Sequence, residues 1–82
     1  MNNKEIKNII RLSMQKLIND KSIKLTDESK LISDQIIDSL GVIEIVNILE
    51  SKFNIVIDQS ELVVENLDSI EFMTDYISTK IR

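Results

Sequence analysis

Residues 38–53 read DSLGVIEIVNILESKF, and this stretch decides the fold. Its apolar side chains recur at three- and four-residue spacing, as they do in a helix that buries one face. The positions on this inward stripe are Ile45, Val46, Leu49 and Phe53. The pattern predicts a helix that begins near Ser39 and ends near Phe53, with Asn54 terminating it. Gly41 falls in the first turns, where we expect it to be tolerated at some loss of helix propensity.

Two further amphipathic helices flank this one. The first covers about residues 3–19, and the last follows the Asp68-Ser69 pair, which is typical of a helix N-cap. Lys80 and Arg82 stand at the end of the last helix, where cations suit the helix dipole. The apolar positions of the two helices are Ile6, Ile9, Ile10, Met14, Leu17 and Ile18 in the first and Ile70, Met73, Tyr76, Ile77 and Ile81 in the last. The large side chains expected in or beside the core are Met14, Phe53, Phe72, Met73 and Tyr76.

Residues 20–38 lack the helical period and are rich in Asp, Ser, Thr and Lys. We interpret them as a long ordered loop, a feature that is often functional in a small domain. The apolar residues expected to pin this loop are Ile23, Leu25, Leu31, Ile32, Ile36 and Ile37. Residues 55–57 have no second strand to pair with and suggest an extended loop, while residues 61–66 suit a short helix or 3₁₀ turn.

The predicted fold class is therefore all-α. We expect a small helical bundle of three main helices and one short helix, with a long loop between helices 1 and 2. The length of 82 residues suits one domain, which would span residues 1–82. The chain starts at Met1, which favours a free-standing domain over a module of a larger protein. We also expect a monomer.

The composition narrows the function classes. The chain contains no cysteine and no histidine, which removes disulfides, the common zinc sites, a thiol nucleophile and an imidazole base. We therefore expect neither an enzyme nor a metal site. A Ser13-x-x-Lys16 pair is present, but we expect Ser13 to be a solvated helix residue. The net charge of −4 disfavours nucleic acid as a partner and suits partners with basic docking patches. No signal peptide and no stretch long enough to span a membrane is apparent, so we expect a cytoplasmic protein.

The tripeptide Asp38-Ser39-Leu40 falls where the long loop meets the second helix. A serine at this point exposes its hydroxyl at the helix entrance. A phosphodiester on that hydroxyl would lie beside unpaired backbone N–H groups and the positive end of the helix dipole. On the tripeptide alone, an ordinary N-cap serine is the more common explanation.

The longer context of Ser39 changes this balance. Residues 38–53 closely resemble the modification helix of the acyl carrier protein family, in which Asp-Ser-Leu is followed by a Glu/apolar helix that ends in Phe. Residues 31–34 (Leu-Ile-Ser-Asp) resemble the family's lead-in, and residues 65–70 resemble its short third helix running into the fourth. Residues 35–37 depart from the pattern, because the family often has a glycine there.

The resemblance implies a function as a carrier. Ser39 would accept 4′-phosphopantetheine from coenzyme A through a phosphopantetheinyl transferase, and the thiol of this arm would hold acyl groups as thioesters. Asp38 would help the transferase to orient its metal ion and coenzyme A. Further partners would be acyl- or aminoacyl-loading and condensing enzymes. The residues expected to dock them are Leu40, Ile43, Glu44 and Glu50. Half-buried packing for Leu40 and Ile43, and a merely solvated face for the two glutamates, are the alternatives.

Several pathways share this layout, and fatty acid and polyketide synthesis come first. On the second helix, Asn47, Ser51 and Lys52 interrupt the acidic face, which leaves D-alanyl and peptidyl carriers open. A different class of function also remains, namely a helical protein-interaction module of the same fold whose serine is never modified.

Overall fold

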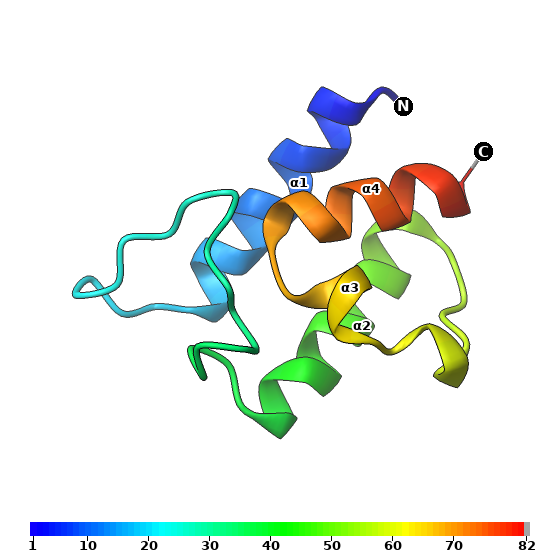
Figure 1. Cartoon of the computed structure of the whole chain (residues 1–82). Helices are drawn as coiled ribbons and strands as arrows, with labels where there is room; N and C mark the ends of the chain where they lie inside the picture. The colour runs from blue at the N-terminus through cyan, green and yellow to red at the C-terminus, as the bar shows by residue number, and fades with distance from the viewer. Residues whose placement is uncertain (82) are drawn as a thin grey trace.

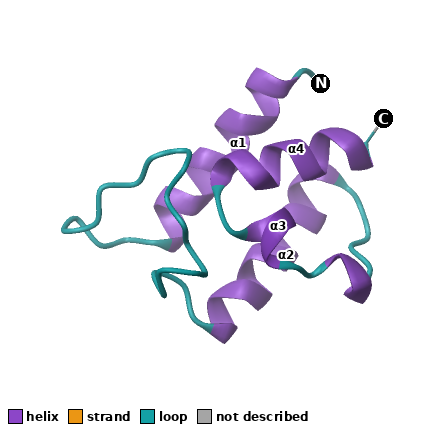
Figure 2. Ribbon diagram, viewed as in Figure 1, coloured by secondary structure: helices purple, strands orange, loops and turns teal. Residues whose placement is uncertain are grey.

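The computed structural model describes residues 1–81 and is built of helices joined by loops (Figures 1 and 2). The elements in chain order are α1 (Asn3–Leu17), α2 (Ser39–Phe53), the 3₁₀ turn η1 (Gln59–Glu61), α3 (Val64–Leu67) and α4 (Ile70–Lys80). The prediction of an all-α fold with three main helices, one short helix and a long loop between α1 and α2 is confirmed. Arg82, expected at the end of the last helix, lies outside the described residues.

Helix α2 has the bounds that its apolar period predicts. Asn54 ends it in the left-handed conformation, with φ 53° and ψ 52°, which asparagine tolerates better than most residues. Residues 55–57, which follow, form a loop and not a strand, as expected. Within residues 1–81, no helix is both long and apolar enough to cross a bilayer.

The core lies where α1 packs against α4 and α2. Its fully buried side chains come from all three main helices and from the loop, and include Ile10, Met14, Leu31, Ile45, Leu49, Met73 and Ile77. Two expectations were wrong. Phe72 is 44% exposed, because it lies beside the buried stripe of α4 rather than on it. Ser13 is buried, because its hydroxyl donates to the carbonyl of Ile9 at 2.8 Å and so needs no water.

The first half of the long loop is held by charged groups. Arg11 reaches from α1 to the Asp27 carboxylate with two N–H···O contacts of 3.2 and 3.0 Å. The hydrogen bonds from Arg11, together with the positive charges of Arg11 and Lys7, keep the pKa of the Asp27 carboxyl below its usual range. Lys7 contacts Glu71 of α4 at 2.7 Å, and the Glu71 N–H donates to the Asp27 carbonyl at 2.9 Å. The loop therefore lies against both α1 and α4.

The second half of the loop is held by Asp68. The prediction that Asp68 and Ser69 form a capping pair is half right: Ser69 caps α4, accepting the Phe72 N–H at 3.0 Å. Asp68 instead turns back to the loop and is only 3% exposed. One of its carboxylate oxygens accepts the N–H groups of Ile32 and Ser33 at 2.8 and 2.9 Å. The other accepts the Ser33 hydroxyl at 2.6 Å.

These contacts set the charge state of Asp68. Burial raises the pKa of its carboxyl, but the hydrogen bonds from Ser33 and the backbone outweigh burial and leave the pKa below its usual range. The carboxylate therefore stabilises the fold above the pKa of an unfolded aspartate, which is about 3.9, and this contribution is lost as the pH falls through the lower folded value.

The acid stability of the protein tests this account. We expect the free energy of unfolding of the wild type to fall more steeply below about pH 4 than that of Asp68→Asn, which cannot titrate. Urea unfolding of both proteins from pH 6 to pH 2.5 gives the comparison. A difference between the two proteins that stays constant over this range would contradict the assignment.

The burial of α2 gives a second prediction. Leu49→Ala should lower the free energy of unfolding by about 2–5 kcal/mol, because Leu49 is fully buried and its loss leaves a cavity. Leu40→Ala, on the same helix but 69% exposed, is the control and should change it by less than about 0.5 kcal/mol. The midpoints of urea denaturation give both values. Equal effects of the two changes would show that the inward stripe is wrongly assigned.

Candidate functional site

Ser39 is the first residue of α2, and its neighbour performs the capping. The Asp38 carboxylate accepts the Gly41 N–H at 2.9 Å, and the Asp38 carbonyl accepts the Val42 N–H at 3.0 Å. The simple N-cap explanation for Ser39 is therefore wrong. Its side chain is exposed and forms no hydrogen bond with any residue of the described range 1–81. The hydroxyl is thus available for chemistry.

The backbone around Ser39 suits a negatively charged group. Asp38 satisfies the N–H groups of Gly41 and Val42, but those of Ser39 and Leu40 have no acceptor among residues 1–81. Such unpaired N–H groups carry the positive end of the helix dipole. A phosphate attached to the serine would lie close to both.

Gly41 is required by the loop that precedes the helix. It is buried, and a Cβ there would overlap Cγ2 of Ile37 and lie 3.3 Å from the Cβ of Ile37. Our expectation that this glycine is merely tolerated was therefore incomplete. The absence of a side chain lets Ile37 lie directly on the first turn of α2, next to Ser39.

Gln35 occupies the position where the loop departs from the family pattern. Its backbone is left-handed, with φ 58°, a conformation that glycine adopts without strain and glutamine does not. Its N–H donates to the Ile32 carbonyl at 3.0 Å and so closes a tight turn. Gln35 therefore adopts the turn conformation that a glycine would favour, and its backbone is strained as a result.

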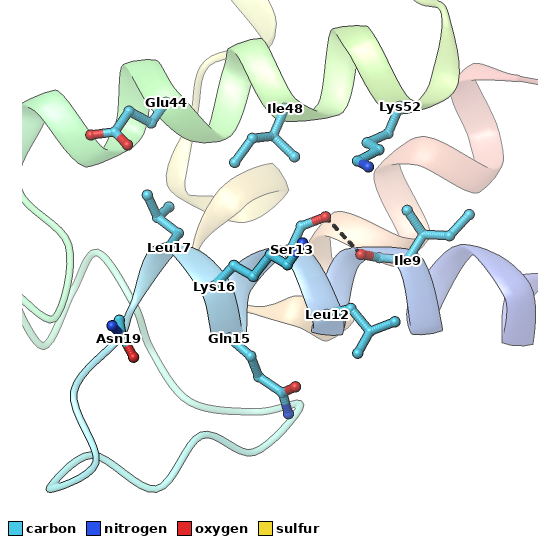
Figure 3. Close-up of a pocket in the computed structure, with 10 residues that line it drawn as sticks. All are labelled: Ile9, Leu12, Ser13, Gln15, Lys16, Leu17, Asn19, Glu44, Ile48 and Lys52. Atoms are coloured by element: carbon cyan, nitrogen blue, oxygen red, sulfur yellow. Dashed lines mark hydrogen bonds between the residues drawn. The ribbon is translucent and has the colours of Figure 1, made fainter.

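Ser39 borders a small hollow between the loop and α2. This hollow has a volume of about 440 Å³ and is lined by Ile32, Gln35, Ile37, Asp38, Ser39 and Val42. A larger groove, of about 830 Å³, lies elsewhere, where Glu44, Ile48 and Lys52 of α2 face α1 (Figure 3). Ser39 does not line that groove. The hollow, unlike the groove, therefore borders the candidate site.

The four residues expected to dock partners lie in different settings. Leu40 and Ile43 are 69% and 57% exposed, so the alternative of half-buried packing does not apply to them. Glu44 is also exposed. Glu50 is partly buried, and its carboxylate accepts the Ile57 N–H at 2.9 Å, which ties the extended loop to α2. Leu40, Ile43 and Glu44 thus form the exposed start of α2.

Sequence reasoning missed the role of Asp68, which binds the loop that leads to Ser39. Its position before Ser69 made it look like part of a helix cap. No local pattern indicated that it binds Ile32 and Ser33, which lie far earlier in the chain. Among residues 1–81, no three acidic side chains gather in a way that would hold a metal ion.

Comparisons with known proteins agree with this geometry. No family model matches the chain. An acyl carrier protein from Buchnera aphidicola subsp. Schizaphis graminum is 33% identical to it over 80 residues, which cover 98% of this chain and 96% of that protein. A second acyl carrier protein, from Buchnera aphidicola subsp. Baizongia pistaciae, is 41% identical over 54 residues, or 66% of this chain and 67% of that protein.

The structure is a small helical bundle with an exposed serine at the start of its second helix, and the hydroxyl of this serine forms no hydrogen bond within residues 1–81. This is the layout of a carrier domain rather than of an enzyme. Near-complete alignment with a known relative then makes the assignment specific. The chain belongs to the acyl carrier protein family, whose members are non-enzymatic carriers.

The strained backbone at Gln35 generates a prediction. Gln35→Gly should raise the free energy of unfolding by about 1 kcal/mol, because relief of the left-handed strain exceeds the added entropy of the unfolded chain. Gln35→Ala keeps the strain and should bring no such gain. Thermal unfolding of the three proteins checks this. A glycine variant less stable than the alanine variant would show that the Gln35 side chain itself stabilises the turn.

Proposed function

We propose that Ser39 carries 4′-phosphopantetheine and that the protein thereby presents acyl groups to partner enzymes as thioesters. The observation that supports this most directly is the exposed Ser39 hydroxyl, left without an intramolecular partner because Asp38 caps α2 in its place. The arm would supply the thiol that the chain lacks, since the sequence contains no cysteine.

The surroundings of Ser39 fit such an arm. Its phosphate would lie near the N–H groups of Ser39 and Leu40, which are unpaired within residues 1–81. The adjoining hollow is lined by the apolar side chains of Ile32, Ile37 and Val42 and by the polar residues Gln35, Asp38 and Ser39. A chain of alternating amide and methylene groups, such as pantetheine, suits both kinds of wall.

Attachment of the arm would follow the ordinary course of phosphoryl transfer. The Ser39 oxygen forms a bond to the phosphorus next to pantetheine in coenzyme A, and the bond from that phosphorus to the remaining nucleotide breaks. The hydroxyl proton passes to a base of the transferase, because the chain has no histidine or cysteine to take it. Asp38 keeps one carboxylate oxygen on the Gly41 N–H and offers the other to the transferase and its metal ion.

The exposed start of α2 is the proposed docking surface for the transferase and for the loading and condensing enzymes. Leu40 and Ile43 would supply apolar contacts beside the arm, and Glu44 would meet a basic patch. Glu50 is a weaker candidate, because its carboxylate already accepts the Ile57 N–H. We place the protein in the cytoplasm, as a single monomeric domain over residues 1–82.

The class of acyl group is a further part of the proposal. The relatives are named acyl carrier proteins, which supports fatty acid or polyketide synthesis. One observation favours a second candidate, a D-alanyl or peptidyl carrier: the exposed residues Asn47, Ser51 and Lys52 make the later turns of α2 less acidic. Partners of such a carrier would need less basic docking patches.

Arm attachment is tested with purified protein, coenzyme A, Mg²⁺ and a promiscuous phosphopantetheinyl transferase. Intact mass with peptide mapping should show one phosphopantetheine on Ser39 of the wild type and none on Ser39→Ala. The variant should lose less than about 0.5 kcal/mol of stability, since Ser39 is not the cap. Ser51→Ala, which removes an exposed serine of the same helix, is the matched control and should load fully.

Two outcomes would contradict the proposal. Uptake of the arm by Ser39→Ala would place the site at another residue. No uptake by folded wild-type protein would favour the unmodified interaction module instead.

A further inference from the structure

A continuous path of contacts joins Asp68, just before α4, to the loop that leads into α2. The Asp68 carboxylate binds the N–H groups of Ile32 and Ser33, at 2.8 and 2.9 Å. Its backbone carbonyl accepts the Leu31 N–H at 2.6 Å. Asp68 therefore grips three consecutive residues of the loop through both its side chain and its main chain.

Leu31 connects Asp68 to the end of the loop that precedes α2. Its side chain is fully buried, which fixes it from a third direction. Its carbonyl accepts the Ile37 N–H at 2.8 Å, so residues 31–37 form a closed loop. The strained Gln35 lies inside this closed loop, which indicates that the surrounding contacts are strong enough to impose its conformation.

Ile37 connects the closed loop to the start of α2. It is 6% exposed and packs against the first turn of α2, where Gly41 leaves room for it. The next residue is the cap, Asp38, and the one after it is Ser39. Loop residues Ile32 and Ile37 also form the walls of the hollow beside Ser39. The closed loop thus connects Asp68 to the start of α2 and to the hollow beside Ser39.

We propose that Asp68 is a positioning residue for attachment of the arm: by holding residues 31–37 it presents Ser39 to the transferase. This inference rests on the proposed function of Ser39. Without the carboxylate, two backbone N–H groups and the Ser33 hydroxyl, whose hydrogen bonds are partly buried, lose their acceptor, and polar groups left without one favour positions open to water. Ile37 would move with the loop, and Ser39 with Ile37. In a reaction that needs alignment of oxygen and phosphorus, a displacement of about 1 Å lowers the rate up to about 100-fold.

The test compares steady-state transfer of the arm to four full-length proteins. For Asp68→Ala we expect kcat to fall about 10- to 100-fold with KM changed less than about threefold, because the exposed residues that dock the transferase are still present. Asp68→Asn keeps an oxygen for the two N–H groups and should recover kcat to within about threefold of the wild type. Asp27→Ala, which releases only the first half of the loop from Arg11, is the control and should keep wild-type kcat.

Amide hydrogen exchange supplies a readout that does not depend on the transferase. In Asp68→Ala, the amides of Ile37 and Val42 should exchange faster than in the wild type, while those of Ile10 and Met73 in the core should not. If Asp68→Ala is unfolded, Ser33→Ala replaces it, because it removes one of the three hydrogen bonds to the carboxylate. A smaller fall in kcat is then expected.

The outcomes separate this inference from the proposed function. Wild-type kcat in folded Asp68→Ala, or an equal loss in Asp27→Ala, would overturn the role of Asp68. A wild-type protein that takes up no arm would overturn the function of Ser39. In that case unchanged exchange at Ile37 and Val42 would also remove Asp68 as the residue that holds the start of α2.

Discussion

A loop without regular secondary structure must find an acceptor for each N–H group that it carries into the interior, and the Asp68 carboxylate meets this need for the long loop of the protein. Two oxygens accept three hydrogen bonds from Ile32 and Ser33, next to the buried Leu31. This one side chain replaces what a strand or helix would otherwise provide. The loop can therefore be long and still deliver α2 to a defined place.

The start of α2 divides three tasks among neighbouring residues. Asp38 caps the helix, Gly41 makes room for Ile37, and Ser39 is left with no structural duty. A serine that capped the helix would have its oxygen occupied by a backbone N–H. Because the cap stands one residue earlier, the hydroxyl is exposed at the start of the helix. This division fits the proposed attachment of the arm to Ser39, because an attachment point must be held in place while its reactive group remains accessible.

Sequence reasoning found what local patterns encode and missed what distant contacts decide. The bounds of α2 and its end at Asn54 follow from a helical period and a helix-stop residue, both readable within a few positions. Ser13 and Phe72 were misplaced because the helical period fixes the middle of an apolar stripe better than its edges. The role of Asp68 depends on a partner that only the folded chain brings near. Ser69 alone caps α4, but Asp68 beside it is an equally common capping residue. The sequence therefore held no signal that Asp68 binds elsewhere.

The two halves of the long loop are held by different interactions, and they should therefore respond differently to salt. The ion pairs of its first half join side chains that are partly open to water: Arg11 is 37% and Lys7 28% exposed. Dissolved salt screens such pairs, with a Debye length of about 8 Å at physiological ionic strength. Asp68 is only 3% exposed, and the partners of its carboxylate are two backbone N–H groups and a hydroxyl rather than a charged side chain. Rising salt concentration should therefore loosen the part of the loop near α1 more than the part that precedes Ser39, so that the proposed carrier site changes little with ionic strength.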